Sequence, residues 1–325
     1  MDKFDVAIIG GGCSGLGAAI YSARFNMRTI VFGGRLGGLI QDTHIVENYP
    51  GFKSLSGYDL YQNLLEHAKV YQKEVIIVEE FVKDIEKKKS EFIIKGEKTK
   101  VVADAIIFAT GTRRKKLNVP GEKEFSNKGV SYCATCDGIL FKNKTCVMVG
   151  GSDSAVKESL LLAEYAKKVY IVYRGEKVHP EPINMKRAEK WMKKGKLEII
   201  NNTNIVEIKG NKFVTSVIFD KSYKGSKEFK CEGIFIEIGH IVESDLAKKL
   251  GVKLSESGEI IIDFDAKTNV PGIFAAGDVV AREWKQAIVG VAEGVLASNS
   301  AYNYIQEQKV KWRKSSFVLS ANQLM

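Results

Sequence analysis

Long apolar runs are absent from this sequence of 325 residues. Because a helix that crosses a membrane needs about 20 consecutive apolar residues, we expect no membrane span. Residues 1–4 lead directly into an apolar strand pattern and do not resemble a signal peptide. We therefore expect a cytoplasmic protein. Only five prolines accompany 30 glycines, which favours tight turns over rigid linkers.

The charge balance is basic, with 49 Lys and Arg residues against 39 Asp and Glu residues and a net charge of +10. An excess of this kind can serve a nucleic acid or an acidic protein partner. The basic residues are spread in short clusters at 87–89, 113–116, 193–194 and 248–249. This spread favours a solvated surface, so we expect no nucleic-acid partner.

Two of the five cysteines, Cys133 and Cys136, lie in the segment YCATCDG at residues 132–138. In a reducing compartment a CxxC pair is more often catalytic or metal-binding than structural. Asp137 follows directly and can move the proton that thiol–disulfide exchange requires. Half of a zinc site is the alternative, although no second CxxC or His-x-x-x-His follows. The other three are predicted to be buried apolar residues: Cys13, Cys146 and Cys231.

A glycine-rich turn near the N-terminus predicts a dinucleotide site. An apolar strand at residues 4–9 leads into GGGCSG at 10–15, and apolar residues at helical spacing follow to residue 25. The glycines permit a tight turn and close backbone approach to a pyrophosphate, and the helix N-terminus supplies N–H donors. The next strand, at residues 28–32, is followed by Gly-Gly-Arg where an acidic ribose ligand is expected. A simple NAD-binding unit is therefore not indicated.

A second strand–turn–helix unit follows later in the chain. It consists of a strand at residues 144–149, the turn GGSDSA at 150–155, a helix at 154–166 and a strand at 169–173. Two such units predict an α/β protein with two Rossmann-like dinucleotide-binding domains.

Other segments complete this α/β pattern. Residues 58–71 predict an amphipathic helix, and residues 101–109 predict a buried strand that ends in Ala-Thr-Gly-Thr. An apolar strand that ends in Gly-Asp is predicted within 270–279. A long helix at 286–305 has small residues on one face. We expect residues 113–116 and 120–121 to be linker.

Together these motifs resemble the low-molecular-weight thioredoxin reductases. The resemblance covers roughly residues 3–305 and rests on segments that occur in the family's order: the first glycine turn, ENYPGF at 47–52, ATG at 109–111, CATCDG at 133–138, AAGD at 275–278 and KQA at 285–287. The family has an FAD domain that is interrupted by a nicotinamide domain. The resemblance implies that residues 1–115 and 243–325 form a discontinuous FAD-binding domain. Residues 116–242 would form an NAD(P)H-binding-type domain that carries the cysteine pair.

The resemblance also implies the roles of individual residues. Cys136 would lie next to the flavin and receive its electrons, Cys133 would exchange with a partner disulfide, and Asp137 would be the acid–base group. The residues expected to bind FAD are Gly10, Gly12, Ser14, Gly15, Gly38, Asn48, Thr110, Gly111, Gly277, Asp278, Lys285, Gln286 and Ala287. Those expected to bind the nucleotide are Gly150, Ser152, Asp153, Ser154 and Arg174. We expect no metal.

The second turn departs from the family pattern, because Ser152 stands where the family has glycine. The family binds the 2′-phosphate of NADPH with a His-Arg-Arg-x-x-x-Arg run, and residues 173–179 are YRGEKVH in this chain. Arg174 is retained, whereas Glu176 adds a negative charge that repels phosphate. We expect NADPH to be a poor donor, and NADH or a donor without nicotinamide to serve better.

The predicted function is that of an FAD-dependent thioredoxin-disulfide reductase. Electrons would pass through FAD and the Cys133–Cys136 disulfide to thioredoxin or a glutaredoxin-like small redox protein. One alternative is the same chemistry fed by NADH, ferredoxin or a deazaflavin, and another is a redox-sensing flavoprotein without turnover. The family is commonly dimeric, which implies a homodimer. No role is predicted for residues 309–325.

Overall fold

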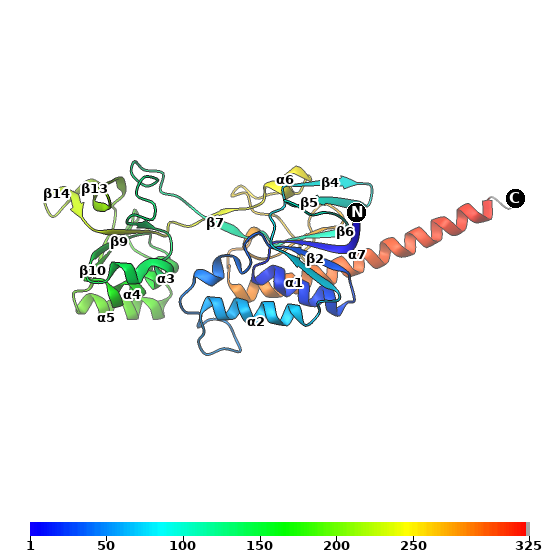
Figure 1. The fold of residues 1–325 in the computed structure, drawn as a ribbon, viewed down its shortest axis with the longest axis horizontal. Helices are drawn as coiled ribbons and strands as arrows, with labels where there is room; N and C mark the ends of the chain where they lie inside the picture. Colours follow the sequence, from blue (N-terminus) through cyan, green and yellow to red (C-terminus); the bar gives the residue numbers. More distant parts are fainter. Residues whose placement is uncertain (323–325) are drawn as a thin grey trace. The chain divides into compact units, whose positions relative to one another are not determined.

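The computed structural model describes residues 1–322, with side chains described through residue 311. The chain divides into two compact units: unit 1 comprises Met1–Arg113 and Val242–Met325, and unit 2 comprises Arg114–Ile241. Each unit has a mainly parallel sheet with helices packed on it (Figure 1). The predicted α/β class with two Rossmann-like units is therefore confirmed. Over the described residues, no helix has the length and apolar character needed to cross a membrane.

The sheet of unit 1 has seven strands in the order β3-β2-β1-β6-β5-β4, and β17 also pairs with β6. The strands are β1 (Asp2–Ile9), β2 (Thr29–Phe32), β3 (Val75–Val78), β4 (Asp84–Lys88), β5 (Glu91–Lys95), β6 (Lys100–Phe108) and β17 (Ile273–Ala275). Strand β5 is antiparallel to both of its neighbours, β4 and β6, and the other pairs are parallel. Ile8 of β1 lies opposite Val31 on one side and Ile107 on the other. Both faces are covered, which explains the continuous apolar runs of β1 and β6.

Small residues bring two helices of unit 1 close together. Ser298 of α7 donates a hydrogen bond to the carbonyl oxygen of Ala18 in α1 at 2.7 Å. A Cβ atom at Gly294 of α7 would lie 2.3 Å from the carbonyl oxygen of Ser14. The small-residue face predicted for the last helix therefore serves to pack α7 against α1. The helices of this unit are α1 (Cys13–Arg24), η1 (Gly38–Asp42), α2 (Gly57–Lys69), α6 (Asp245–Lys249), η3 (Gly277–Val279) and α7 (Ala287–Asn322).

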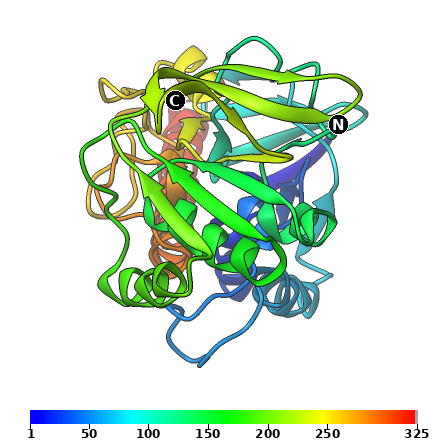
Figure 2. The ribbon, with the colours of Figure 1, turned by 90° about the vertical axis from the view of Figure 1, so that its left-hand side faces the viewer.

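Unit 2 has a parallel five-stranded sheet in the order β11-β10-β9-β15-β8 and an antiparallel three-stranded sheet in the order β12-β13-β14. Figure 2 shows its helices on one side of the parallel sheet and the antiparallel sheet on the other. Alternate residues of β9 follow this division, because Met148 packs with the helices and Val147 packs with the antiparallel sheet. The strands are β8 (Val130–Ser131), β9 (Thr145–Val149), β10 (Lys168–Val172), β11 (Leu197–Ile200), β12 (Ile205–Gly210), β13 (Val214–Tyr223), β14 (Ser226–Lys230) and β15 (Gly233–Ile236). The helices are α3 (Ala134–Asp137), η2 (Gly138–Phe141), α4 (Asp153–Tyr165) and α5 (Pro182–Lys193).

Two local features differ from the sequence-based expectation. The segment expected to be linker contains strand β7 (Thr112–Arg114), which pairs with β16 (His240–Val242) in a two-stranded sheet. The sequence prediction also omitted helix α5. Its inner face carries Met185, Ala188 and Trp191 at helical spacing, a short apolar stripe that the sequence prediction overlooked among charged residues.

We expect Ile107→Ala to lower the free energy of unfolding by about 2–5 kcal/mol, because truncation of a buried side chain leaves a cavity. Ile107 is fully buried in β6. Ile76→Ala on edge strand β3 is the matched control, since Ile76 is 42% exposed, and it should cost about 1 kcal/mol or less. Urea unfolding followed by far-UV circular dichroism measures both variants. Equal losses would show that β6 is not part of a packed core.

Candidate active site

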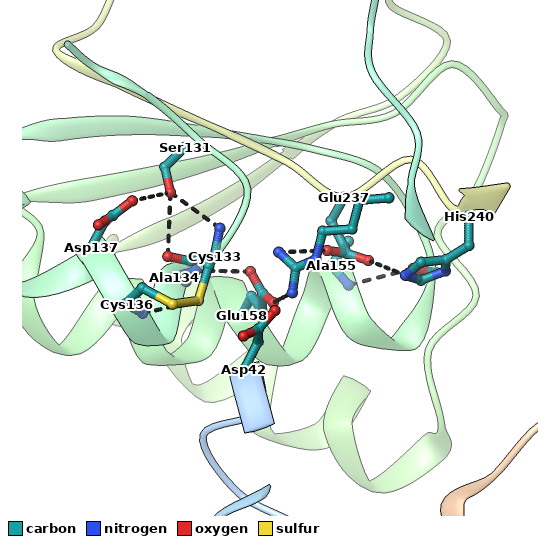
Figure 3. Close-up of polar contacts among 12 residues, drawn as sticks. Asp42, Ser131, Cys133, Ala134, Cys136, Asp137, Ala155, Glu158, Glu237 and His240 are labelled. Carbon is teal, nitrogen blue, oxygen red and sulfur yellow. Dashed lines mark hydrogen bonds and ion pairs between the residues drawn. A yellow bond between two sulfur atoms is a disulfide. The ribbon is translucent and has the colours of Figure 1, made fainter. Parts of the chain in front are cut away.

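The two cysteines of the CxxC motif form a disulfide. Their sulfurs are 2.09 Å apart and their Cα atoms are 5.3 Å apart (Figure 3). Cys133 precedes helix α3, and Cys136 lies within it. Because each sulfur is bonded to the other, the pair is arranged for thiol–disulfide chemistry and not as two zinc ligands.

Ser131 links the disulfide to the neighbouring carboxylate. Its hydroxyl accepts a hydrogen bond from the backbone N–H of Cys133 at 3.1 Å and donates one to Oδ2 of Asp137 at 2.6 Å (Figure 3). Ser131 is buried at the end of β8, so these bonds are shielded from water. Asp137 is thereby held beside the disulfide, where an acid–base group for exchange is required.

A second carboxylate binds the backbone between the two cysteines. Oε2 of Glu158, on α4, accepts a hydrogen bond from the N–H of Ala134 at 3.1 Å (Figure 3). Its Oε1 lies 3.7 Å from Nη2 of Arg114, whose Nη1 lies 3.8 Å from Oε2 of Glu237. Nε2 of His240 lies 3.8 Å from the other oxygen of Glu237. A line of ionisable groups therefore begins at the CxxC backbone and ends at β16.

Tyr132, the residue before the motif, is fixed by a buried carboxylate. Glu122 accepts hydrogen bonds from the backbone N–H groups of Leu117 and Asn118, at 2.8 and 2.5 Å, and from the Tyr132 hydroxyl at 2.7 Å. Burial, and then this carboxylate, raises the pKa of Tyr132. The phenol therefore stays protonated and remains a hydrogen-bond donor near neutral pH.

The other three cysteines are free and buried, as predicted. Burial raises the pKa of Cys13 to about 12, and the charge of Asp278 contributes to the same shift. Burial also raises the pKa of Cys146 to about 12 and raises that of Cys231. Since the thiolate is the nucleophile, these thiols are unreactive near neutral pH. The chemistry is therefore confined to the CxxC pair.

The first glycine turn fits the pyrophosphate of a dinucleotide such as FAD. A Cβ atom at Gly15 would lie 1.9 Å from the carbonyl oxygen of Gly10, so only glycine permits this strand–helix approach. At Gly12 a Cβ atom would meet only the carbonyl oxygen of Gly37, at 3.8 Å, which leaves space beside the turn. Gly12 is the N-cap of α1, and no side chain caps that end. The N-terminal N–H groups of α1 are thus available to phosphate oxygens.

Other residues expected to bind FAD lie around this turn. A Cβ atom at Gly277 would lie 2.1 Å from Oγ of Ser14, and one at Gly38 would lie 3.7 Å from Cα of Gly12. Thr110 donates from Oγ1 to the carbonyl oxygen of Glu243 at 2.6 Å. The next residue, Gly111, accepts at its carbonyl oxygen from the N–H of Glu243 at 3.1 Å.

The remaining members of that set meet at the start of α7. Nδ2 of Asn48 donates to Oε1 of Gln286 at 2.9 Å, although the two residues are far apart in the sequence. Nζ of Lys285 donates to the carbonyl oxygen of Asp278 at 2.9 Å. Ala287 is the first residue of α7. The expected FAD residues therefore gather in unit 1.

The second glycine turn differs from the first at its third position, where Ser152 stands in place of glycine. The middle glycine is covered in both turns: a Cβ atom at Gly151 would lie 2.5 Å from the ring of Tyr173, and one at Gly11 would lie 2.7 Å from Cδ2 of Leu36. The hydroxyl of Ser152 accepts from the N–H of Ala155 at 3.4 Å and caps the N-terminus of α4.

The other predicted nucleotide ligands lie at the same end of the parallel sheet. Oδ1 of Asp153 accepts from the N–H of Glu181 at 2.8 Å and from Nδ2 of Asn184 at 2.7 Å, which ties it to the start of α5. Gly150 directly follows β9, Ser154 is exposed in the first turn of α4, and Arg174 is exposed after β10.

Comparison with known proteins agrees with this fold and disulfide. The family model for pyridine nucleotide-disulphide oxidoreductases matches residues 4–294 of this chain. A thioredoxin reductase of Listeria innocua serovar 6a is 41% identical over 310 residues, which cover 94% of this chain and 95% of the relative. The solved structure of Lactococcus lactis thioredoxin reductase is 36% identical, with a TM-score of 0.88 over 94% of this chain and 99% of that one. A ferredoxin-flavin thioredoxin reductase of Clostridium acetobutylicum is 31% identical, with a TM-score of 0.52 over 95% of this chain and all of that one.

The chain therefore belongs to the pyridine nucleotide-disulphide oxidoreductase family, in its low-molecular-weight thioredoxin reductase branch. The predicted family, the predicted class of enzyme and the pairing of Cys133 with Cys136 are confirmed.

Sequence reasoning missed the residues that hold the motif in place, namely Ser131, Glu158 and Glu122. Ser131 precedes the first cysteine by only two residues, and this short separation was the one sequence feature that pointed to it. Glu158 contacts Ala134 across 24 positions. Nothing local marks that contact, because it depends on how α4 packs beside α3.

We expect Asp137→Asn to slow reduction of the Cys133–Cys136 disulfide by dithiothreitol about a hundredfold, because general acid–base groups contribute factors of about 10²–10⁴. Asp220→Asn, on β13 of the same unit, is the matched control and should leave the rate unchanged. Quenching with acid and alkylating the free thiols gives the rate for each protein. A wild-type rate in Asp137→Asn would remove this residue from the exchange step.

Proposed function

We propose that this protein is a flavin-dependent reductase that reduces the disulfide of thioredoxin or a glutaredoxin-like small redox protein. One observation carries the proposal: a CxxC disulfide is held beside a carboxylate by Ser131. Two relatives that are 41% and 36% identical are named thioredoxin reductases, which supports the same assignment.

FAD would be the bound cofactor of unit 1. When bound, it supplies a carrier that accepts electrons from a donor and delivers them to a disulfide. The turn at Gly10, Gly12 and Gly15 would bind its pyrophosphate at the N-terminus of α1. Asp278 would bind the ribityl chain, and the Asn48–Gln286 pair would lie near the ring system. The last two roles follow from the family resemblance.

The protein's own groups carry out the exchange with the partner. Two electrons and two protons convert the Cys133–Cys136 disulfide into two thiols. The thiolate of Cys133 then attacks one sulfur of the partner disulfide, which breaks that bond and forms a mixed disulfide. Cys136 attacks the sulfur of Cys133, so that the enzyme disulfide forms again and the partner leaves as a dithiol. Asp137 accepts the proton of the attacking thiol and returns one to the leaving sulfur.

The surface beside the motif favours an acidic protein partner. Ile139 and Leu140 directly follow the CxxC helix and are 56% and 67% exposed. Unit 2 contains 24 Lys and Arg residues and 15 Asp and Glu residues, so it carries +9 of the net charge of +10. Exposed apolar side chains on a basic unit suit a partner with an apolar patch and net negative charge.

The location and assembly of the protein are also part of this proposal. Free thiols at Cys13, Cys146 and Cys231 suit a reducing compartment such as the cytoplasm. A homodimer is proposed from the family resemblance.

We expect FAD-loaded protein, given an electron donor and oxidised thioredoxin, to produce thioredoxin thiols with turnover. Cys133→Ser and Cys136→Ser should each abolish turnover, since each removes one sulfur of the exchanging pair. Cys231→Ser, which changes a buried thiol of the same unit, is the matched control and should keep full activity. Release of thiols is measured with a chromogenic disulfide reagent. Turnover by either CxxC variant would contradict the proposed path.

The electron donor is the finer part of the proposal. We infer that NADPH is a poor donor, because residues 173–179 offer Arg174 and Glu176 where a 2′-phosphate needs several cations. Ser152 caps the α4 N-terminus and competes there with the pyrophosphate of either nucleotide. Glu176 is exposed two residues after Arg174 and would repel a 2′-phosphate. A donor without nicotinamide is the second candidate, and the match to a ferredoxin-flavin thioredoxin reductase favours it.

We expect NADH to reduce the bound flavin at least as efficiently as NADPH. We also expect Glu176→Gln to raise the efficiency of NADPH about two- to fivefold, because exposed charge pairs contribute about 0.2–1 kcal/mol. Lys177→Gln is the matched control and should lower it. Stopped-flow spectroscopy of the flavin band measures each reaction. A tenfold advantage of NADPH over NADH in the wild type would contradict this inference.

A further inference from the structure

We propose that Glu158 is a positioning residue that sets the redox potential of the Cys133–Cys136 pair through its negative charge. This proposal rests on the proposed function only in that the pair cycles between disulfide and dithiol. The contacts of the Glu158 side chain in unit 2 carry this proposal (Figure 3).

Glu158 reaches the backbone between the two sulfurs. Its Oε2 lies 3.1 Å from the backbone nitrogen of Ala134, which is bonded to the carbonyl carbon of Cys133. The side chain is 16% exposed, so water screens its charge only partly. Ser152 caps the N-terminus of α4 six residues, about 1.7 turns, before Glu158, so the carboxylate projects from a capped helix.

The guanidinium of Arg114 faces two carboxylates, Glu158 and Glu237. Nη2 of Arg114 lies 3.7 Å from Oε1 of Glu158, and Nη1 lies 3.8 Å from Oε2 of Glu237. Both distances exceed those of charge-assisted hydrogen bonds, which are about 2.7–2.9 Å. The guanidinium of Arg114 thus lies between two carboxylates, while the other oxygen of Glu158 contacts the backbone of the CxxC segment.

This charge affects the two redox states of the pair differently. A disulfide is neutral, whereas the reduced pair can carry a thiolate. In exchange with dithiothreitol, the Cys133–Cys136 bond breaks, the ring disulfide of dithiothreitol forms, and two electrons and two protons move to the protein. A fixed negative charge at the backbone between the two cysteines disfavours the thiolate, so it favours the disulfide and lowers the potential.

A purely structural role predicts a different pattern of variants. Glu158→Gln removes the charge but keeps an oxygen that accepts from the N–H of Ala134. Glu158→Ala removes both the charge and the acceptor. Glu164→Gln makes the same change of charge on the same helix, about 9 Å further along its axis, at an exposed side chain.

The test is the equilibrium of each full-length protein with reduced and oxidised dithiothreitol at pH 7. After an acid quench and alkylation, mass spectrometry gives the fraction of Cys133–Cys136 dithiol. Glu158→Gln should shift the equilibrium constant at least tenfold toward the dithiol, which for a two-electron couple is about 30 mV upward. Glu164→Gln should stay within twofold of the wild type.

Two outcomes would overturn the proposal. A wild-type equilibrium in Glu158→Gln, with a shift only in Glu158→Ala, would show that the carboxylate merely caps α3. A wild-type equilibrium in both variants would show that it has no effect on the pair. The measurement requires neither flavin turnover nor a protein partner. Failure of the proposed function in the turnover assay is therefore distinguishable from failure here.

Discussion

The four-residue helix that carries the disulfide cannot be stable by itself, because a helix this short forms too few internal hydrogen bonds. Its backbone bonds of helical type join the N–H of Asp137 to the carbonyl oxygen of Cys133 at 3.1 Å and the N–H of Gly138 to the carbonyl oxygen of Ala134. Two N-terminal donors have partners of another kind, since Ala134 donates to Glu158 and Cys136 donates to Sγ of Cys133. The positions of both sulfurs therefore depend on the side chains of Ser131 in β8 and Glu158 in α4.

The two glycine turns show how one local plan can lead to different binding properties. Each turn follows a buried central strand and leads into a helix. At the first glycine of each turn, Gly10 or Gly150, a Cβ atom would lie about 2 Å from a backbone carbonyl oxygen. In unit 1 the α1 N-terminus has no side-chain cap, whereas in unit 2 Ser152 caps α4. A cap uses the N–H groups that a phosphate would bind. The N-terminus of α1 is therefore better suited to a pyrophosphate than that of α4.

The sequence was sufficient for features that depend on neighbouring residues. The strand–turn–helix units and the CxxC-Asp motif are of this kind, because the glycines, apolar runs and cysteines that define them are contiguous. It was insufficient where distant segments meet. Glu158 reaches Ala134 and Asn48 reaches Gln286 only after the helices have packed. The basic residues of β7 predict a linker, because the strand's pairing partner, β16, lies over a hundred positions away.

The central claim is that a flavin in unit 1 and the Cys133–Cys136 disulfide form one electron path. Anaerobic titration of the FAD-loaded protein with dithionite, followed at the flavin band and by thiol counting, tests it most directly. The account predicts uptake of about four electrons per chain, two by the flavin and two by the disulfide. It predicts about two for the Cys133→Ser/Cys136→Ser double variant. Uptake of only two electrons by the wild type, with the disulfide left oxidised, would contradict the account.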